Sequence, residues 1–291
     1  MAILDRSTLQ PYIELVRLDR PIAVGFLALP CYWGVALAKA SFMATIGWFI
    51  VFGLGAIVMR SAGCAFNDWA DADIDPYVKR TQSRPLATKA LSHTQALLVF
   101  AIACLLGLAI WWQLPPLGRT FSIVALILAV AYPFSKRFMR WPQVVLGLAF
   151  NSGVLVAWAT IQPRFTTLIA CLLLYTAGVF WTLAYDTIYA FPDRKYDQEL
   201  GMNSLALSWE PQDLKKNILL FYWISFSCLM AAGLVANLRM YYYLLILGVI
   251  NFMLWRLYQL NLDDDADCLR FFKINIILGI AVFFGIMIST R

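Results

Sequence analysis

Long apolar runs alternate along this chain with short polar connections. A helix needs roughly 20 apolar residues to cross a bilayer. The segments that meet this length are 21–40, 44–66, 95–113, 119–135, 142–161, 165–186, 217–238, 241–260 and 271–289. The segments lack strand-like alternation, and a helix satisfies its own backbone hydrogen bonds in lipid. The pattern therefore predicts an all-α, polytopic membrane bundle of nine transmembrane helices.

Composition supports a membrane protein. The chain has 291 residues, of which 62% are hydrophobic and 14% charged, whereas soluble domains average about 25% charged residues. The six cysteines are scattered without a CxxC pair, which argues against a disulfide framework and a cysteine metal site. The two longest connections, 67–94 and 186–216, resemble each other. We therefore expect a single domain, 1–291, built from two related halves, roughly 1–140 and 141–291.

Charged residues collect on one side of the predicted bundle. The N-terminus and the even-numbered connections share this side, which carries most of the 23 Lys and Arg residues and all 17 acidic ones. The positive-inside rule makes it cytoplasmic. The first 20 residues contain Asp5, Glu14 and Asp19 and no apolar core. We therefore expect no cleavable signal or transit peptide, which favours a bacterial inner membrane. The net charge indicates no nucleic-acid-binding patch, and the oligomeric state stays open.

Two acidic segments stand at the mouths of apolar runs. The first, 67–75, contains Asn67, Asp68, Asp71, Asp73 and Asp75, and the second, 193–197, begins with Asp193 and ends with Asp197. On a helix the spacing i, i+4, i+8 would put Asn67, Asp71 and Asp75 on one face, with Asp73 off this stripe. Like charges at that spacing repel one another unless a cation lies between them. Mg²⁺ prefers oxygen ligands, often one or two carboxylates plus substrate phosphates. The two segments together predict a site for Mg²⁺ and a diphosphate.

Basic residues follow these acids. We expect Lys79, Arg80 and Arg84 to contact phosphate oxygens directly. Lys136 and Arg137, in the connection that begins at Tyr132, are placed to reach the diphosphate from the side.

Polar residues inside the apolar runs are functional candidates, because hydrocarbon disfavours them. Arg60 lies seven residues before Asn67, about 10 Å deeper on a helix, and would suit an anionic substrate group such as a carboxylate. Asp186 bears the same relation to Asp193, and Asn151 and Tyr185 are candidates to line a central cavity. Two further expectations are structural: Asn251 bonds between helices, and the acidic run 263–267 is a solvated loop.

These residues resemble the UbiA family of intramembrane prenyltransferases. The resemblance rests on Asn67-Asp68-x-x-Asp71-x-x-x-Asp75 and Asp193-x-x-x-Asp197, which match the two aspartate-rich motifs of the family. Lys79-Arg80-Thr81 with Ser83-Arg84-Pro85, and Tyr132-Pro133-Phe134 with Lys136-Arg137, agree as well. The stretch Tyr185-Asp186-Thr187 is similar to the subgroup that prenylates 4-hydroxybenzoate in ubiquinone synthesis. The resemblance covers essentially the whole chain.

The resemblance implies a nine-helix bundle around a central cavity that opens sideways to lipid. It implies that Mg²⁺ ions bind the diphosphate of a polyprenyl diphosphate and that the polyprenyl group moves to the ring carbon ortho to the acceptor's hydroxyl. The implied ligands of the metal are Asn67, Asp68, Asp71, Asp75, Asp193 and Asp197, of which Asp71, Asp75, Asp193 and Asp197 are the implied catalytic residues. Arg60, Asn67, Tyr185 and Asp186 are the implied acceptor-binding residues.

Some points stay open at the level of sequence. The ring proton has three candidate acceptors, namely Asp186, Asp75 and the leaving diphosphate. The subgroup commonly has Gly-x-Lys-Ser where this chain has Gly201-Met202-Asn203-Ser204, so Arg194 or Lys195 would replace that lysine at the diphosphate. The alternatives are a UbiA-type enzyme for another acceptor (a naphthoate, a chlorin or haem) and an ion-coupled transporter. A transporter needs access from both sides, whereas the acids here share one.

Overall fold

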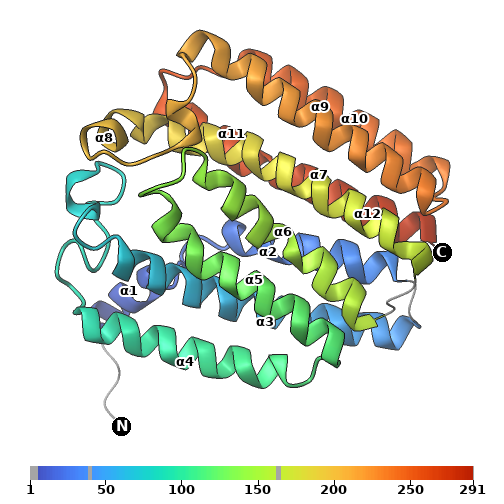
Figure 1. Ribbon diagram of the computed structural model, residues 1–291, viewed down its shortest axis with the longest axis horizontal. Coiled ribbons are helices and arrows are strands. Elements are labelled where there is room, and N and C mark those ends of the chain that lie inside the picture. The colour runs from blue at the N-terminus through green and yellow to red at the C-terminus, as the bar shows by residue number, and fades with distance from the viewer. Residues whose placement is uncertain (1–5, 39–40, 162–164, 291) are drawn as a thin grey trace.

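The computed structural model is an elongated bundle of helices (Figure 1) and describes residues 6–38, 41–161 and 165–290. The helices are α1 (Arg6–Leu15), α2 (Ile22–Leu37), α3 (Phe42–Ala70), α4 (His93–Trp111), α5 (Pro116–Ser135), α6 (Pro142–Ile161), α7 (Phe165–Ala190), α8 (Arg194–Glu199), α9 (Pro211–Val235), α10 (Met240–Gln259), α11 (Asp265–Ile274) and α12 (Ile276–Thr290). Three short 3₁₀ turns join them: η1 (Asp75–Tyr77), η2 (Phe191–Asp193) and η3 (Leu205–Leu207).

The predicted spans correspond to these helices. Within the described residues, eight helical segments are long and apolar enough to cross a membrane, and α2 is a shorter apolar helix of 16 residues. The all-α membrane fold is confirmed. The last predicted span, 271–289, lies within the segment Asp265–Ser289, in which α11 and α12 meet at Asn275.

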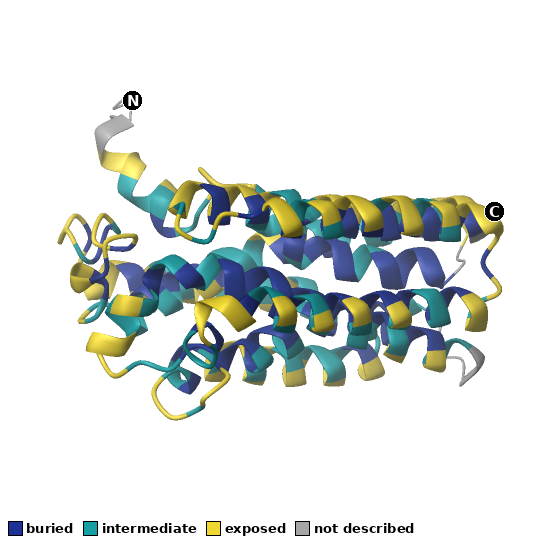
Figure 2. Ribbon diagram, turned by 90° about the horizontal axis from the view of Figure 1, so that it is seen from above, coloured by how far each residue is buried: buried dark blue, intermediate teal, exposed yellow. Residues whose placement is uncertain are grey.

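The bundle has a central layer and a lipid-exposed exterior. Helix α6 packs against α2, α5 and α7, and most of its residues are buried. Helix α4 packs mainly along α3, and its outer face carries exposed Leu98, Ile102 and Leu105. Buried residues face the middle of the bundle and exposed ones face outward (Figure 2). Because the exposed side chains are apolar, the exterior suits lipid.

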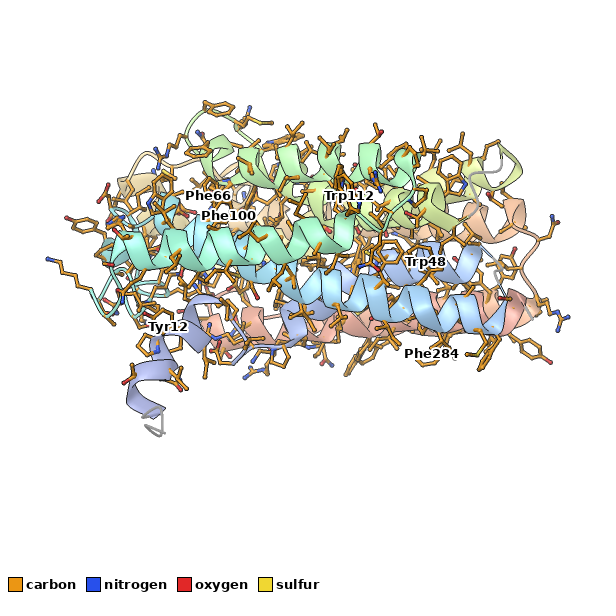
Figure 3. The ribbon with its side chains drawn as sticks, turned by 90° about the horizontal axis from the view of Figure 1, so that it is seen from below. Tyr12, Trp48, Phe66, Phe100, Trp112 and Phe284 are labelled. Atoms are coloured by element: carbon orange, nitrogen blue, oxygen red, sulfur yellow. The ribbon has the colours of Figure 1, made fainter. Side chains whose placement is uncertain are left out.

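Aromatic rings join the outer helices to α3. Phe66 on α3 and Phe100 on α4 lie side by side (Figure 3), with ring centroids 5.1 Å apart. The ring centroid of Phe134 on α5 lies 6.0 Å from that of Phe66. These contacts stabilise the ends of α3, α4 and α5 at the end of the bundle where α3 and α7 finish. We call this the site end, because both acidic segments follow these two helices there (Figure 1).

Asn275 connects three helices at the break between α11 and α12. Its Oδ1 accepts hydrogen bonds from Trp181 Nε1 on α7 at 3.0 Å and from the Tyr222 hydroxyl on α9 at 2.6 Å. Its Nδ2 donates to the carbonyl oxygen of Phe271 at 2.9 Å. The Asn275 side chain is fully buried, so each of these hydrogen bonds replaces one that the polar atoms would make to water in the unfolded chain.

Replacing Asn275 with leucine is expected to lower the free energy of unfolding by about 1–3 kcal/mol, because Trp181 and Tyr222 would each keep a buried donor without an acceptor. Thermal unfolding in detergent measures the change. Asn251→Leu is the matched control. Contrary to the expected interhelical role, Asn251 is exposed and donates to Leu247 O of its own helix at 2.8 Å. Equal melting temperatures for the two variants would contradict the assigned role of Asn275.

Candidate active site

The first acidic segment is not one continuous helix, so the predicted stripe is wrong in part. Helix α3 ends at Ala70, and Asp71 caps it, with its backbone N–H bonded to Asn67 O at 2.9 Å. A turn follows, and Asp75 opens η1. The Asn67 amide donates to Asp71 Oδ2 at 3.1 Å. The turn folds the Asp75 carboxylate back toward the end of α3. A continuous helix would instead carry Asp75 away from that end.

Two arginines neutralise the outer carboxylates of this segment. Arg17 Nη2 lies 2.8 Å from Asp68 Oδ2, and Arg84 Nη1 lies 3.1 Å from Asp68 Oδ1 and 2.8 Å from Asp75 Oδ2. Asp68 and Asp75 are both almost fully buried. Burial raises the pKa of the Asp75 carboxyl above its usual range, while Arg84 opposes the shift. The arginine therefore favours the charged form of a buried acid.

The second acidic segment meets the first across the site end. Asp193 ends η2, directly after α7, and its Oδ2 accepts from Arg80 Nε at 2.6 Å and lies 2.5 Å from Arg80 Nη2. Burial alone lowers the pKa of the Arg80 guanidinium, but Tyr189 and Asp193 beside it outweigh burial and raise the pKa above its usual value. Arg80, a predicted phosphate contact, thus links the first connection to the second acidic segment.

The two carboxylate oxygens of Asp71 differ in their contacts. Its Oδ2 is 3.3 Å from Lys136 Nζ. Its Oδ1 is buried and has no hydrogen-bond partner in the structure. Lys136 is itself held by Asn203, whose backbone N–H donates to Lys136 O at 2.8 Å. Asn203, which stands where the subgroup commonly has lysine, therefore supports another lysine that contacts the acidic segment.

Arg60 lies deeper in the bundle, as its position in the sequence predicts. Its Cζ stands 5.6 Å from the ring centroid of Phe150 on α6, so the side chain points inward, and its Nε is buried without a hydrogen-bond partner. Tyr185 and Asp186 are buried on α7. Asn151 donates to Thr182 Oγ1 at 2.9 Å, and Thr182 donates to the Tyr185 hydroxyl at 3.2 Å. Asn151 thus holds Tyr185 through Thr182.

The other predicted cations lie nearer the rim. Arg137 donates to Ala70 O, at the last residue of α3, at 2.9 Å. The Cζ of Arg194 lies 4.3 Å from the Phe191 ring centroid. Lys79 and Lys195 are exposed, and Asp197 is half-buried in α8. Among these residues, only Arg137 has a side-chain hydrogen bond to the end of α3.

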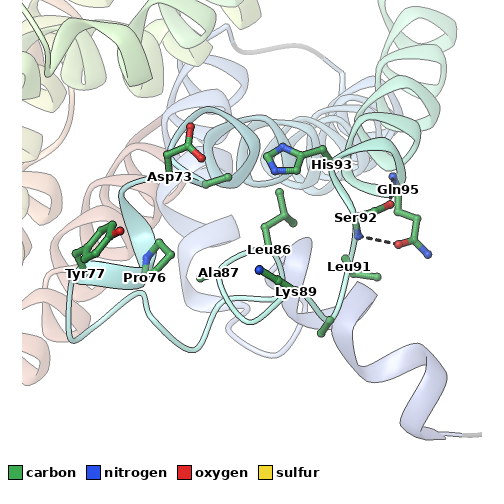
Figure 4. A pocket seen from close by; sticks show the side chains of 12 residues that line it. Asp73, Pro76, Tyr77, Leu86, Ala87, Lys89, Leu91, Ser92, His93 and Gln95 are labelled. Atoms are coloured by element: carbon green, nitrogen blue, oxygen red, sulfur yellow. Dashed lines mark hydrogen bonds between the residues drawn. The ribbon is translucent and has the colours of Figure 1, made fainter.

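Asp73 does not join the cluster. It is exposed and lines a hollow of about 560 Å³ on the outer side of the connection between α3 and α4, with Tyr77, Lys89 and His93. Figure 4 shows this hollow. It lies apart from the ion pairs described above, as the position of Asp73 off the stripe predicts.

Sequence reasoning gave no role to three residues that the structure ties to charged groups. Arg17 pairs with Asp68, and its φ of 59° is unusual for a residue other than glycine. The Tyr189 hydroxyl accepts from Arg80 Nη1 at 2.9 Å. Asp267, expected in a solvated loop, is buried and bonded to Arg256, Arg270 and the backbone N–H of Asn261. A basic residue just before an apolar run was the available signal for Arg17.

The acidic segments fit a divalent cation that shares its ligands with a substrate. Within the described residues, no three carboxylate, histidine or cysteine side chains are grouped closely enough to hold a metal ion alone. Mg²⁺ needs only one or two carboxylates when phosphate and water complete its shell. The unpartnered Oδ1 of Asp71 is a buried oxygen suited to such an ion.

Comparison with known proteins agrees with this geometry. The model of the UbiA prenyltransferase family matches residues 27–278. The mitochondrial 4-hydroxybenzoate polyprenyltransferase of Drosophila melanogaster is 38% identical over 285 residues, which is 98% of this chain and 72% of the relative. The 4-hydroxybenzoate octaprenyltransferase of Tolumonas auensis is 36% identical over 280 residues, 96% of each chain.

Solved structures share the fold. A UbiA homolog from Aeropyrum pernix K1, in its apo form, has a TM-score of 0.75 and 23% identity and covers 92% of this chain and 98% of its own. A UbiA homolog from Archaeoglobus fulgidus, bound to GPP and Mg²⁺, has a TM-score of 0.71 and 19% identity, with 95% and 99% covered. At these identities the likeness shows the fold alone.

Proposed function

This chain belongs to the UbiA prenyltransferase family, and from that premise we propose that it transfers a polyprenyl group from a polyprenyl diphosphate to 4-hydroxybenzoate. The new bond forms at the ring carbon ortho to the hydroxyl, and the products are the prenylated acid, diphosphate and a proton. The named relatives support the acceptor, since both act on 4-hydroxybenzoate by name. The observation that carries the chemistry is the meeting of two acidic segments with Arg80, Arg84 and Lys136 at one end of a membrane bundle.

The acidic segments would hold the metal. We assign Asp71, Asp75, Asp193 and Asp197, with Asn67 and Asp68, to Mg²⁺. When bound, Mg²⁺ would neutralise the charge that develops on the departing diphosphate. Arg80 and Arg84, which pair with Asp193 and Asp75 in this structure, would turn to the phosphate oxygens, with Lys79, Lys136, Arg137 and Arg194 around them. These charges would favour departure of the diphosphate, because they oppose the negative charge that develops on it.

The interior of the bundle would hold the acceptor. Arg60 is the side chain placed to pair with the acceptor carboxylate, because its Nε is buried and unpartnered below the acidic segments. Asn67, Tyr185 and Asp186 would stand around the ring and its hydroxyl. The surrounding apolar helices would accommodate the polyprenyl tail and keep bulk water from the reactive allylic carbon. We place the active site at the cytoplasmic face of the membrane, on the charge asymmetry of the sequence, and propose a bacterial inner membrane as the location.

The transfer reaction itself tests this proposal. Purified protein in detergent, given geranyl diphosphate, 4-hydroxybenzoate and Mg²⁺, is expected to form geranylated 4-hydroxybenzoate, which mass spectrometry identifies. Removal of divalent metal with a chelator should abolish the product, and excess Mg²⁺ should restore it. A parallel reaction with 1,4-dihydroxy-2-naphthoate measures acceptor choice. Prenylation of the naphthoate alone, or product formation that survives chelation, would contradict the proposal.

A further inference from the structure

One face of α3 carries a regular stripe of residues. Thr45, Phe52, Ala56, Gly63 and Asn67 follow one another at spacings of seven and four, which places them on the same side of a helix. This side faces the bundle interior, because Phe52 packs in a buried cluster with residues of α2 and α6. Thr45, Phe52 and Ala56 are all buried.

Gly63 breaks this run of buried residues. It is exposed, and a Cβ built on it would meet no heavy atom within 4 Å. Most other interior glycines have a packing reason: a Cβ on Gly34 would lie 2.7 Å from Ala157 Cβ, and one on Gly279 would lie 2.7 Å from Leu29 Cδ1. Packing therefore does not require glycine at position 63. Glycine also weakens a helix interior, so neither packing nor helix propensity favours glycine at this position.

The open space beside Gly63 lies between two buried polar atoms that have no hydrogen-bond partner. Arg60, three residues earlier and so on a neighbouring part of the same face, has the buried Nε described above. Asp71, beyond Asn67 at the end of the helix, has the buried Oδ1. The helix rise puts Arg60 and Asn67 about 10 Å apart along α3, with Gly63 near the midpoint. A buried guanidinium nitrogen and a buried carboxylate oxygen, both without hydrogen-bond partners, thus bracket the space that glycine leaves free.

We propose that Gly63 is a specificity-determining residue, whose missing side chain leaves room for the aromatic ring of the acceptor between Arg60 and Asn67. This inference rests on the proposed function, because it assumes that Arg60 binds the acceptor carboxylate. A ring held there by its carboxylate points its hydroxyl end toward the acidic segments, and it passes the level of Gly63. A side chain at this position occupies the space of the ring and leaves the diphosphate contacts of Arg80 and Arg84 unchanged.

Gly63→Ala and Gly63→Val test the inference. With the valine variant, the KM for 4-hydroxybenzoate is expected to rise about tenfold or more, and with alanine it should rise less, since added methyl groups fill the space of the ring. The KM for geranyl diphosphate should stay within about twofold of the wild-type value.

Gly47→Val is the matched control. Gly47 lies on the same helix and also has no neighbour within 4 Å, but it lies on the lipid-facing side with exposed Ile50 and Leu54. The Gly47→Val variant should keep the wild-type activity.

A second measurement does not depend on turnover. Gly63→Cys should react with a small, membrane-permeant methanethiosulfonate, located by mass spectrometry of the peptide, and 4-hydroxybenzoate should slow the reaction. Gly47→Cys should show no such protection.

An unchanged acceptor KM in Gly63→Val, or a larger rise in the KM for geranyl diphosphate, would overturn the role of Gly63 while leaving the proposed function intact. Labelling of Gly63→Cys at the same rate with and without 4-hydroxybenzoate would overturn it as well. A wild-type protein without transferase activity would count against the proposed function. If 4-hydroxybenzoate still slowed the labelling of Gly63→Cys in that case, binding of the acceptor beside position 63 would remain supported.

Discussion

Replacing Asp71 with alanine is expected to lower kcat for prenyl transfer by about 10³-fold or more, the loss that follows when a group acting on transition-state charge is removed from a buried site. Asp71 is only 5% exposed, and Asn67 and Lys136 lie against one of its oxygens. Its other oxygen has no partner, so the carboxylate is held in place with one ligand position free. Steady-state kinetics with geranyl diphosphate and saturating Mg²⁺ measures the loss.

Asp73→Ala is the matched control for this prediction. Asp73 is two residues further along the same connection, but it is exposed and lines the outer hollow. The expected kcat of this variant is close to the wild-type value. Asp193→Ala should resemble Asp71→Ala, because it removes the carboxylate of the second acidic segment that holds Arg80. Full activity in Asp71→Ala would exclude the Asp71 carboxylate from catalysis. An equal loss of kcat in Asp73→Ala would show that the overall charge of this connection, and not the Asp71 carboxylate in particular, supports catalysis.

Replacing Arg60 with alanine is expected to raise the KM for 4-hydroxybenzoate by about 10- to 100-fold, which corresponds to the loss of about 1.5–3 kcal/mol from hydrogen bonds to a charged group. The kcat and the KM for geranyl diphosphate should change much less, because Arg60 lies below the acidic segments. Initial rates over a range of acceptor concentrations measure this. Arg60 is suited to the role because its Nε is buried and unpartnered, and the ring of Phe150 lies beside the guanidinium.

The acceptor offers the control for Arg60. Wild-type protein and Arg60→Ala should use an acceptor without the carboxylate, such as 4-hydroxybenzamide, with similar KM values, since this acceptor has no anion for Arg60 to bind. Arg60→Lys keeps the charge but not the planar fork of donors, so an intermediate KM is expected. An acceptor KM that is unchanged in Arg60→Ala would remove Arg60 from this role.

Much of the site was readable from the sequence, because its components are local. The acidic segments directly follow the long helices α3 and α7, so hydropathy and charge alone placed them at one end of the bundle. The depth of Arg60 followed from helical periodicity in the same way. The expected helical stripe through Asp75 was wrong because α3 ends at Ala70 with Asp71 as its C-cap, and local propensity does not fix the residue at which a helix ends.

Other features depended on contacts between distant residues. Arg80 bonds to Asp193, 113 positions away, and Arg17 bonds to Asp68, 51 positions away. The sequence showed acids and cations in plausible numbers but not their partners. The same applies to Asn203, which replaces an expected lysine and turns out to hold the backbone of Lys136. The expected division into two related halves stays a prediction.

The sequence by itself determined the class of protein, its helices and the two acidic segments, because hydrocarbon accepts helices of a certain length and charged residues stay at their ends. Only the tertiary structure decided which carboxylate keeps a free oxygen and which glycine borders open space. Asp71 and Gly63 are ordinary by composition and spacing. Their distinction comes from what lies beside them: Lys136 and Asn67 occupy one oxygen of Asp71, and no side chain fills the space next to Gly63.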